Sequence, residues 1–479
     1  MFSTRFLLLA GLLCTLGAAS APAAPPDTVR VGLTEAIVSA LDVSPEVDRR
    51  RAQRRFASAR SDRARANRYL TDLSFNVASS FAPGLDNVPP GTPDDELYLD
   101  PSVTNDWSIG ALRPFGRAEI TARQPLFTWG ELSGTIEAAE RGVAVEEARV
   151  EQKALEVAAR TGELYYTLLL TQALDRLADR TGDVIDRAKR EINRLLEEGD
   201  ESVDQADLFQ TRLTEEEYER RLVEIKQNRA TARSALRRQL FLPDGTPVAV
   251  AAEELRPIDF SVHPDSLAHY IQLGLRNRPE VDQAAAGIEA REALVDVARS
   301  DFYPKVGVQA SLSQGVTLPP RPNPDNAFVG DSFMGTGTRT GLGIELNLNF
   351  GQTAARVEQA KAELNEVEHQ QTAARQLVRF EVEEAYRSLL TAKTAVESRD
   401  SSTTIAGEWL RTEQIDFDLG FGDTENLVKA VRASLEAEAR YVEAVKEYNV
   451  AVLKLLRATG TLTDRVQNGT LVDSTSGEE

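Results

Sequence analysis

The chain has 479 residues, of which 42% are hydrophobic, 6% aromatic and 27% charged, and its formal net charge is −20. This composition is too hydrophobic for a disordered chain and too poor in aromatic residues for several thick globular cores. The acidic balance makes duplex nucleic acid an unsuitable main partner, and a single Cys excludes an internal disulfide. Long stretches rich in Ala, Arg, Glu and Leu are instead typical of long helices that pack through narrow seams.

Residues 1–23 are predicted to form a secretory signal peptide. Arg5 supplies the positive charge, residues 6–16 form an apolar stretch too short to span a bilayer, and residues 21–23 (Ala-Pro-Ala) fit a cleavage site. Lipid attachment at Cys14 is disfavoured because it requires a small residue immediately before the cysteine, where this chain has a leucine. No later segment has 18 consecutive apolar residues, so the exported chain is expected to stay soluble, leave the cell or enter an outer membrane as a β-barrel.

The mature sequence contains an internal duplication. Residues 33–69 align without gaps on 267–303, and 13 of the 37 pairs are identical; a second offset aligns Gly130 with Gly351 and Tyr165 with Tyr386. The predicted organisation is an N-terminal segment, a first repeat, a Pro/Ala-rich linker, a second repeat and a disordered tail, over 24–33, 34–241, 242–265, 266–460 and 461–479.

Each repeat has the same predicted order of elements. A helical stretch (34–68 and 266–300) is followed by two strands, a very long helical stretch (130–198 and 352–419), a glycine-containing turn and a further helix (202–240 and 424–458). About 68 helical residues make a rod of roughly 100 Å, which no globular core requires. Such a rod has the length of a coiled coil or of a tube that crosses a compartment.

Four segments alternate apolar and polar residues with period two, which predicts strands with one apolar and one wet face. They lie near 72–81, 117–126, 306–313 and 342–349. Each is long enough to cross a bilayer as a tilted strand, although a half-buried sheet of a soluble domain has the same period.

Aromatic residues and loops favour the membrane alternative. The two loops near 82–116 and 314–340 are long and polar, and the aromatic residues gather at the opposite strand ends, as in an interfacial belt. The predicted belt consists of Tyr69, Phe127, Trp129, Phe302, Tyr303 and Phe350. Because four strands cannot close a barrel and an open edge cannot face lipid, several chains must share one barrel: two would give eight strands and three would give twelve.

With this order of elements the chain resembles the outer membrane efflux protein family, the TolC-like channels. Local signatures are residues 301–304 (Asp-Phe-Tyr-Pro) entering the third strand, residues 124–127 (Gln-Pro-Leu-Phe) leaving the second, and Gly199 and Gly420 in the helix–helix turns. The resemblance implies a mostly α-helical fold with membrane β-strands, assembled as a homotrimer with a 12-stranded β-barrel in the outer membrane and an α-helical barrel in the periplasm.

The resemblance also implies a function and partners. The chain would be the passive outer-membrane exit duct of a tripartite efflux or type I secretion system, docking on a periplasmic adaptor (membrane fusion protein) and an inner-membrane RND or ABC transporter. The alternative is a soluble periplasmic coiled-coil adaptor or structural protein. No phosphate-binding loop or catalytic motif occurs, and His263, His269 and His369 lack metal-ligand spacing, so neither an enzyme nor a metal or other cofactor is expected.

The helix–helix turns are the expected docking and gating sites. Glycine ends one helix and a hydroxyl residue caps the next, and the predicted adaptor-docking residues are Gly199, Asp200, Ser202, Gly420, Phe421, Gly422 and Thr424. Relatives narrow the tunnel near these turns with acidic side chains, which implies a constriction at Asp207, with Asp204 as an alternative. The matching positions of the second repeat are Asn426 and Lys429. A solvated helix face explains the same residues, and the non-acidic Asn426 predicts weak cation selectivity.

The first helical stretch is strongly basic. Its arginines are better explained by ion pairing with Glu-rich helices such as 137–156, or by lipid headgroups, than by nucleic acid. They are Arg49, Arg50, Arg51, Arg54, Arg55, Arg60, Arg63, Arg65 and Arg68.

Overall fold

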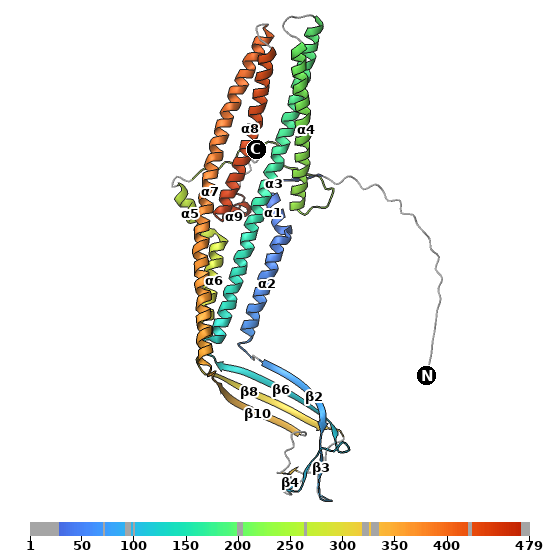
Figure 1. The fold of residues 1–479 in the computed structure, drawn as a ribbon, viewed down its shortest axis with the longest axis vertical. Coiled ribbons are helices and arrows are strands. Elements are labelled where there is room, and N and C mark those ends of the chain that lie inside the picture. Colours follow the sequence, from blue (N-terminus) through green and yellow to red (C-terminus); the bar gives the residue numbers. More distant parts are fainter. Residues whose placement is uncertain are drawn as a thin grey trace, which may run out of the picture.

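The computed structural model shows a rod-shaped molecule with two helical hairpins at one end and a four-stranded sheet at the other (Figure 1). Short helices surround the middle of the rod. The structure describes residues 28–69, 72–91, 97–98, 101–198, 205–262, 266–318, 325–326, 335–419 and 424–470.

The helices repeat in matching pairs, which confirms the tandem duplication. The paired helices have 11 and 12, 22 and 22, 68 and 69, and 35 and 35 residues. In chain order these pairs are α1 Leu33–Val43 with α5 Ser266–Asn277, α2 Pro45–Ala66 with α6 Pro279–Ser300, α3 Glu131–Glu198 with α7 Phe350–Asp418, and α4 Gln205–Gln239 with α8 Thr424–Ala458.

The first helical stretch of each repeat, expected to be continuous, is broken in the structure. Ser44 caps α2 by accepting a hydrogen bond from the Val47 amide at 3.5 Å, and Pro45 occupies the first turn. Pro279 begins α6 in the same way after Arg278. Proline lacks the amide hydrogen that a continuing helix requires, so it starts a new helix at a changed angle.

The four long strands form one antiparallel sheet in the order β10-β8-β6-β2. The central pair, β6 and β8, comes from different repeats, so the two halves share the sheet. The strands are β2 Asp72–Ala82, β6 Arg113–Phe127, β8 Lys305–Thr317 and β10 Gly335–Glu345. The fourth strand was expected at 342–349 but begins at Gly335, and Leu346 and Leu348 follow its end.

The sheet register aligns the apolar positions of neighbouring strands. Phe75 lies opposite Ile120, and Ile120 lies opposite Leu312; Leu342 lies opposite Val308. Because side chains alternate between faces, most apolar residues of the four strands share one face, and the charged residues share the other. Short pairs of strands extend the loops beyond the sheet: β3 Gly84–Asp86 with β5 Thr104–Asp106, and β4 Leu97–Tyr98 with β9 Asp325–Asn326.

The hydrophobic core lies in a collar around the middle of the rod. We define the collar as β1 Val29–Val31, α1, β7 Val248–Val250, residues 251–262, α5 with the Arg278 that follows it, and α9 Leu462–Gln467, together with the parts of the long helices that they contact (Figure 1). Strands β1 and β7 pair in parallel, and fully buried residues include Leu33, Ile37, Leu236, Leu389 and Leu455.

The collar corrects two predictions. The segment 242–265, expected to be a linker, contains β7, and Asn449 of α8 holds its backbone by accepting from the Ile258 amide at 2.8 Å and donating to the Arg256 carbonyl at 2.9 Å. The tail, expected to be disordered from 461, begins with α9, which buries Leu462 and Val466. Their i, i+4 spacing puts both on one helix face. Residues 471–479 lie outside the described ranges.

Packing of the rods gives each chain two open sides. On the sheet side of the collar the helices contact each other in the order α2-α3-α6-α7, and towards the hairpin ends in the order α4-α3-α8-α7. One open side therefore consists of α2 and α4, and the other is α7 along its whole length. The sheet ends correspondingly in β2 and β10.

Candidate channel surfaces

The apolar face of the sheet is exposed. Phe75 is 66% exposed, Leu312 49% and Leu342 75%. A soluble monomer rarely leaves such a continuous apolar face in water. The opposite face carries charged pairs, including Arg123 with Asp72 at 3.7 Å. This face arrangement is that of a membrane barrel wall with a polar interior.

Both edges of the sheet are open. Among the described residues, β2 pairs only with β6 and β10 pairs only with β8. All residues of β10 are exposed. An unpaired row of backbone amides and carbonyls cannot face lipid, because each unsatisfied group costs several kcal/mol there. Each edge therefore lacks a partner strand within the described part of the chain.

The predicted aromatic belt lies where the sheet meets the rods. Trp129 stacks on Tyr303 with ring centroids 4.9 Å apart and meets Phe127 edge-on at 4.8 Å. Phe302 stacks parallel to Phe350 at 6.5 Å. Tyr69, in the α2–β2 connection, is 77% exposed. The structure thus gathers five of the six residues into two ring clusters; their contact with a membrane interface stays a prediction.

The same junction is held by a turn and by ion pairs. Trp129 has φ 52° and Gly130 has φ 95°, which turns the chain sharply from β6 into α3. The Trp129 indole donates to the Pro304 carbonyl at 2.8 Å. Asp301 contacts both Lys305, at 2.9 Å, and Arg356, at 2.8 Å. These contacts fix the direction of the sheet relative to the rods.

Most predicted docking and constriction residues lie outside the described ranges. These are Gly199, Asp200, Ser202, Asp204, Gly420, Phe421 and Gly422. Thr424 is the first residue of α8 and Asp207 the third of α4. Asn426 is exposed near the start of α8, and Lys429 pairs with Glu425 at 2.6 Å. The structure therefore places Asp207, Thr424 and Asn426 in the first turns of α4 and α8, and the roles of the whole set stay predictions.

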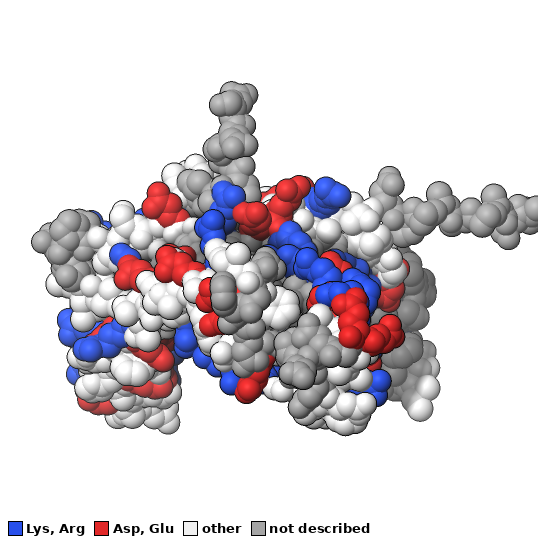
Figure 2. All heavy atoms as spheres, turned by 90° about the horizontal axis from the view of Figure 1, so that it is seen from above, with Lys and Arg blue, Asp and Glu red and all other residues white. Residues whose placement is uncertain are grey.

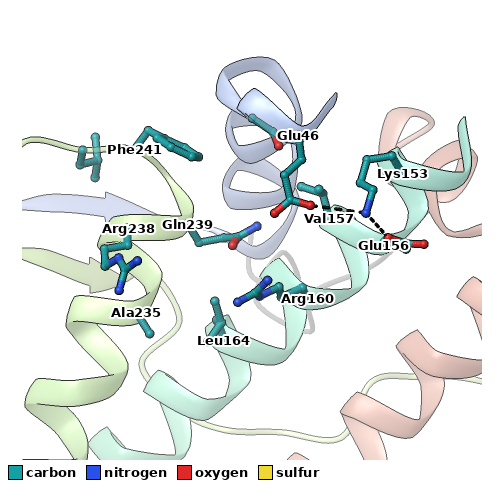
Figure 3. A pocket seen from close by; sticks show the side chains of 12 residues that line it. Glu46, Lys153, Glu156, Val157, Arg160, Leu164, Ala235, Arg238, Gln239 and Phe241 are labelled. Carbon is teal, nitrogen blue, oxygen red and sulfur yellow. Dashed lines mark hydrogen bonds and ion pairs between the residues drawn. The ribbon is translucent and has the colours of Figure 1, made fainter. Parts of the chain in front are cut away.

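A groove of about 630 Å³ opens beside the collar, between the start of α2, α3 and the end of α4 (Figure 3). Lys153 lies between Glu46, at 3.4 Å, and Glu156, at 2.5 Å. The Glu156 hydrogen bond is the main cause of the raised pKa of Lys153. Arg160 and Arg238 project towards the same space (Figure 3). The lining mixes polar and apolar side chains and is open to solvent, with the features of a surface groove rather than of an enclosed substrate site.

A buried charge cluster in the collar was missed by the sequence reasoning. The Arg278 side chain is only 5% exposed and contacts Glu280 and Glu381, both at 2.8 Å. Burial alone would lower the pKa of Arg278, but the hydrogen bonds to Glu280 and the charges of both carboxylates raise it. The sequence feature that could have indicated this cluster is Glu280, which lies in the Pro-Glu-Val-Asp sequence that both repeats contain.

Other kinds of site find no support in the described part of the chain. None of the described helices has a stretch apolar enough to cross a membrane. No cluster of metal-ligating side chains occurs among the described residues. Seen along the rod from the hairpin ends, acidic and basic side chains are interspersed rather than separated by sign (Figure 2).

Three solved structures of outer-membrane proteins have the same fold as this chain. The chain is 17% identical to the open-state MtrE outer membrane channel of Neisseria gonorrhoeae, with a TM-score of 0.71 over 90% of this chain and 89% of that one. For VceC, an outer membrane protein of Vibrio cholerae, the identity is 18% and the TM-score 0.68, over 89% and 96% of the two chains. The CmeC outer membrane channel of Campylobacter jejuni gives 15% and 0.68, over 92% and 90%.

Sequence comparisons agree with the fold. Protein CyaE of Bordetella pertussis is 26% identical over 236 residues, which are 49% of this chain and 47% of that protein, so the chain spans about half the length of this curated relative. The family model described as "Outer membrane efflux protein" matches residues 116–240 and 270–461, most of both repeats. This chain, with its duplicated hairpins and shared sheet, belongs to the outer membrane efflux protein family.

Proposed function

We propose that three copies of this chain close into a ring that forms an outer-membrane exit duct. The observation that carries the proposal is the four-stranded sheet with two open edges and one exposed apolar face. Three copies of four strands give twelve. A barrel of eight strands fills its interior with side chains, whereas a larger one leaves a water-filled lumen.

The rods continue the duct into the periplasm. Helices α3 and α7 have 68 and 69 residues, so each is about 100 Å long at 1.5 Å per residue. The hairpin ends lie at the far end from the sheet (Figure 1). There they would meet a periplasmic adaptor and an inner-membrane RND or ABC transporter, which would supply the energy for efflux or type I secretion.

The soluble-adaptor alternative accounts less well for the structure. A soluble spacer has no need for a sheet that exposes Phe75, Leu342 and Ile344 at 66%, 75% and 75%. It also has no need for open strand edges, which promote aggregation in water.

Membrane fractionation of cells that express the full chain tests the duct. We expect the protein in the outer-membrane fraction, migrating as a trimer in unheated detergent gels and as a monomer after heating. The purified trimer should conduct ions in planar bilayers. A soluble protein that is monomeric without detergent would falsify the proposal.

The proposed constriction is tested on the same channel. If Asp207 forms a ring of three carboxylates in the lumen, Asp207→Ala lowers the preference for cations in planar bilayers. Asn426→Ala, at the matching position of α8, is the neutral control and should leave the preference as in the parent. Equal ion selectivity in all three channels would remove Asp207 from the constriction.

A further inference from the structure

Helix α2 has one face in contact with α3 and an opposite face without a helix partner in the described chain. Val47, Ser61 and Ala64 are its buried residues. On the opposite side Ala52, Phe56 and Ala59 follow one another at spacings of four and three, as in a coiled-coil seam. Phe56 is 67% exposed. The arginines beside this stripe are Arg49, Arg55, Arg60 and Arg63, and all are exposed.

The duplication provides a template for the missing partner. Helix α6 is the repeat of α2 and packs between α3 and α7, whereas the one extensive helix contact of α2 within the described ranges is with α3. The contact of α2 with α3 corresponds to that of α6 with α7. The contact of α6 with α3 therefore has no counterpart within the chain. Its counterpart would join α2 to α7, and these two helices lie on opposite open sides of the same chain.

The intrachain contact defines which residues would meet. Gly134 of α3 lies so close to α6 that an added Cβ would fall 3.0 Å from the Ala293 carbonyl oxygen and 2.9 Å from Val297. Arg141 pairs with Glu289 at 2.6 Å. By the second offset of the duplication, Gly134 corresponds to Ala355 and Arg141 to Ala362 on α7. By the first offset, Ala293 corresponds to Ala59, Val297 to Arg63 and Glu289 to Arg55 on α2.

The resulting surfaces are complementary in size and in charge. Ala355 and Ala362 are exposed and small, so the face of α7 admits close approach by another helix. Glu358 and Glu366 are exposed one turn to either side of Ala362. They contact Lys361 and Gln370 on their own helix, in exposed pairs of the kind that contribute little to stability. Arg55 would therefore lie between two carboxylates.

The positions of the positive and negative side chains are exchanged between the α3–α6 contact within the chain and the α2–α7 contact between chains. Within the chain, α3 carries the arginine and α6 the glutamate. Between chains, α2 would carry the arginines and α7 the glutamates. Placing α2 against the α3 surface of a neighbour would bring Arg55 towards Arg141, which is repulsive, so the reversal disfavours the wrong order of helices.

We propose that the arginine-flanked stripe of α2 (Ala52, Phe56 and Ala59 with Arg55 and Arg63) docks on the exposed face of α7 of a second copy, around Ala355, Glu358, Ala362 and Glu366. The proposal rests on the ring proposed above and assigns the contact that closes it. The reversed charges fix the order of the helices around the ring.

Disulfide trapping tests the register of this contact. The one Cys of the sequence is Cys14, within the predicted signal peptide, so engineered cysteines have no competitor in the mature chain. In the double variant Ala59→Cys/Ala355→Cys, treatment with diamide should give covalent multimers in heated, non-reducing gels. Neither single variant should give the covalent trimer, because each chain then has only one of the two cysteines. The matched control is Ala59→Cys/Ala373→Cys, whose second cysteine is exposed on the same helix about 27 Å further along and should stay uncrosslinked.

Charge reversal tests the electrostatic part. Arg55→Glu should lower the temperature at which the trimer dissociates in detergent gels, and adding Glu358→Arg and Glu366→Arg should restore it. The restored variant distinguishes a specific contact from a general folding defect. If the parent chain forms a trimer but the first cysteine pair gives no crosslink, the proposed α2–α7 contact is wrong. Equal crosslinking in the control pair has the same meaning. Either result leaves the proposed duct intact. A parent chain that forms no trimer contradicts the proposed function itself.

Discussion

The collar and the sheet use hydrophobic residues in opposite ways. In the collar Leu389 and Leu455 are fully buried among helices of the same chain. In the sheet Leu342 and Ile344 are each 75% exposed, and the polar residues take the other face. The collar therefore stabilises a single chain, whereas the sheet leaves its apolar face exposed and both of its edges open. Leucine and isoleucine therefore form a core in the collar and an exposed surface in the sheet.

The largest effect is expected for the buried cation of the collar. Arg278→Ala leaves Glu280 and Glu381 without their shared partner and should lower the free energy of unfolding by about 3–5 kcal/mol. Arg256→Ala is the matched control, since its pair with Glu254 is exposed and within the same collar; exposed pairs contribute about 1 kcal/mol or less. Urea unfolding of the detergent-solubilised protein measures both. Equal losses would show that burial of Arg278 has no energetic consequence.

Replacing a leucine by alanine in each region compares the stability contributed by a buried leucine of the collar with that of an exposed leucine of the sheet. Leu389→Ala removes a fully buried side chain and should cost about 2–5 kcal/mol. Leu342→Ala removes one that faces outward and should cost much less in the same urea titration. If both variants lost the same stability, the sheet would bury its apolar face against protein, contrary to a lipid-facing wall.

Placing a charge on one face of β8 or on the other distinguishes the lipid-facing side of the strand from the lumen-facing side. Leu312→Arg places a cation on the apolar face and should cost about 2–4 kcal/mol near the bilayer midplane, reducing the trimer in the outer membrane. Ser311→Arg, one residue away on the polar face, should assemble normally. The readout is the amount of heat-dissociable trimer in outer-membrane fractions. Similar losses for both variants would argue against a membrane on one side only.

The smallest effect concerns pH. Partial burial, followed by the charges of Glu147, Asp282 and Asp464, raises the pKa of Glu151 above 4.5. The folded state therefore binds the proton more tightly than the unfolded state, so the wild type has its full stability below pH 4.5 and loses some as the pH rises through the folded pKa. Glu151→Gln should be slightly more stable than wild type at pH 7 and equal to it near pH 4. A lower thermal midpoint for Glu151→Gln at pH 7 would contradict this sign.

Long and periodic elements could be predicted from the sequence. Helix α8 has the predicted bounds, and the apolar face of all four strands follows the period-two pattern, because a regular element repeats its signal many times. Within the collar, β1, β7 and α9 could not be predicted, because the two strands have three residues each and the helix has six. Such short segments carry too few repeats of any period, and long-range pairing determines their structure. The fourth strand was misplaced because its glycine- and threonine-rich beginning lacks apolar residues.

The pairing of β6 with β8 across the two halves has an evolutionary consequence. In the ring of three chains proposed above, a shorter ancestor with one long hairpin and two strands would need six identical subunits, all joined by a single kind of boundary. Fusion of two such units made alternate boundaries covalent, and each kind could then diverge chemically. The arginine lies on α3, as Arg141, at the boundary within the chain and on α2, as Arg55, at the proposed boundary between chains, which shows how the two kinds of boundary differ in this protein.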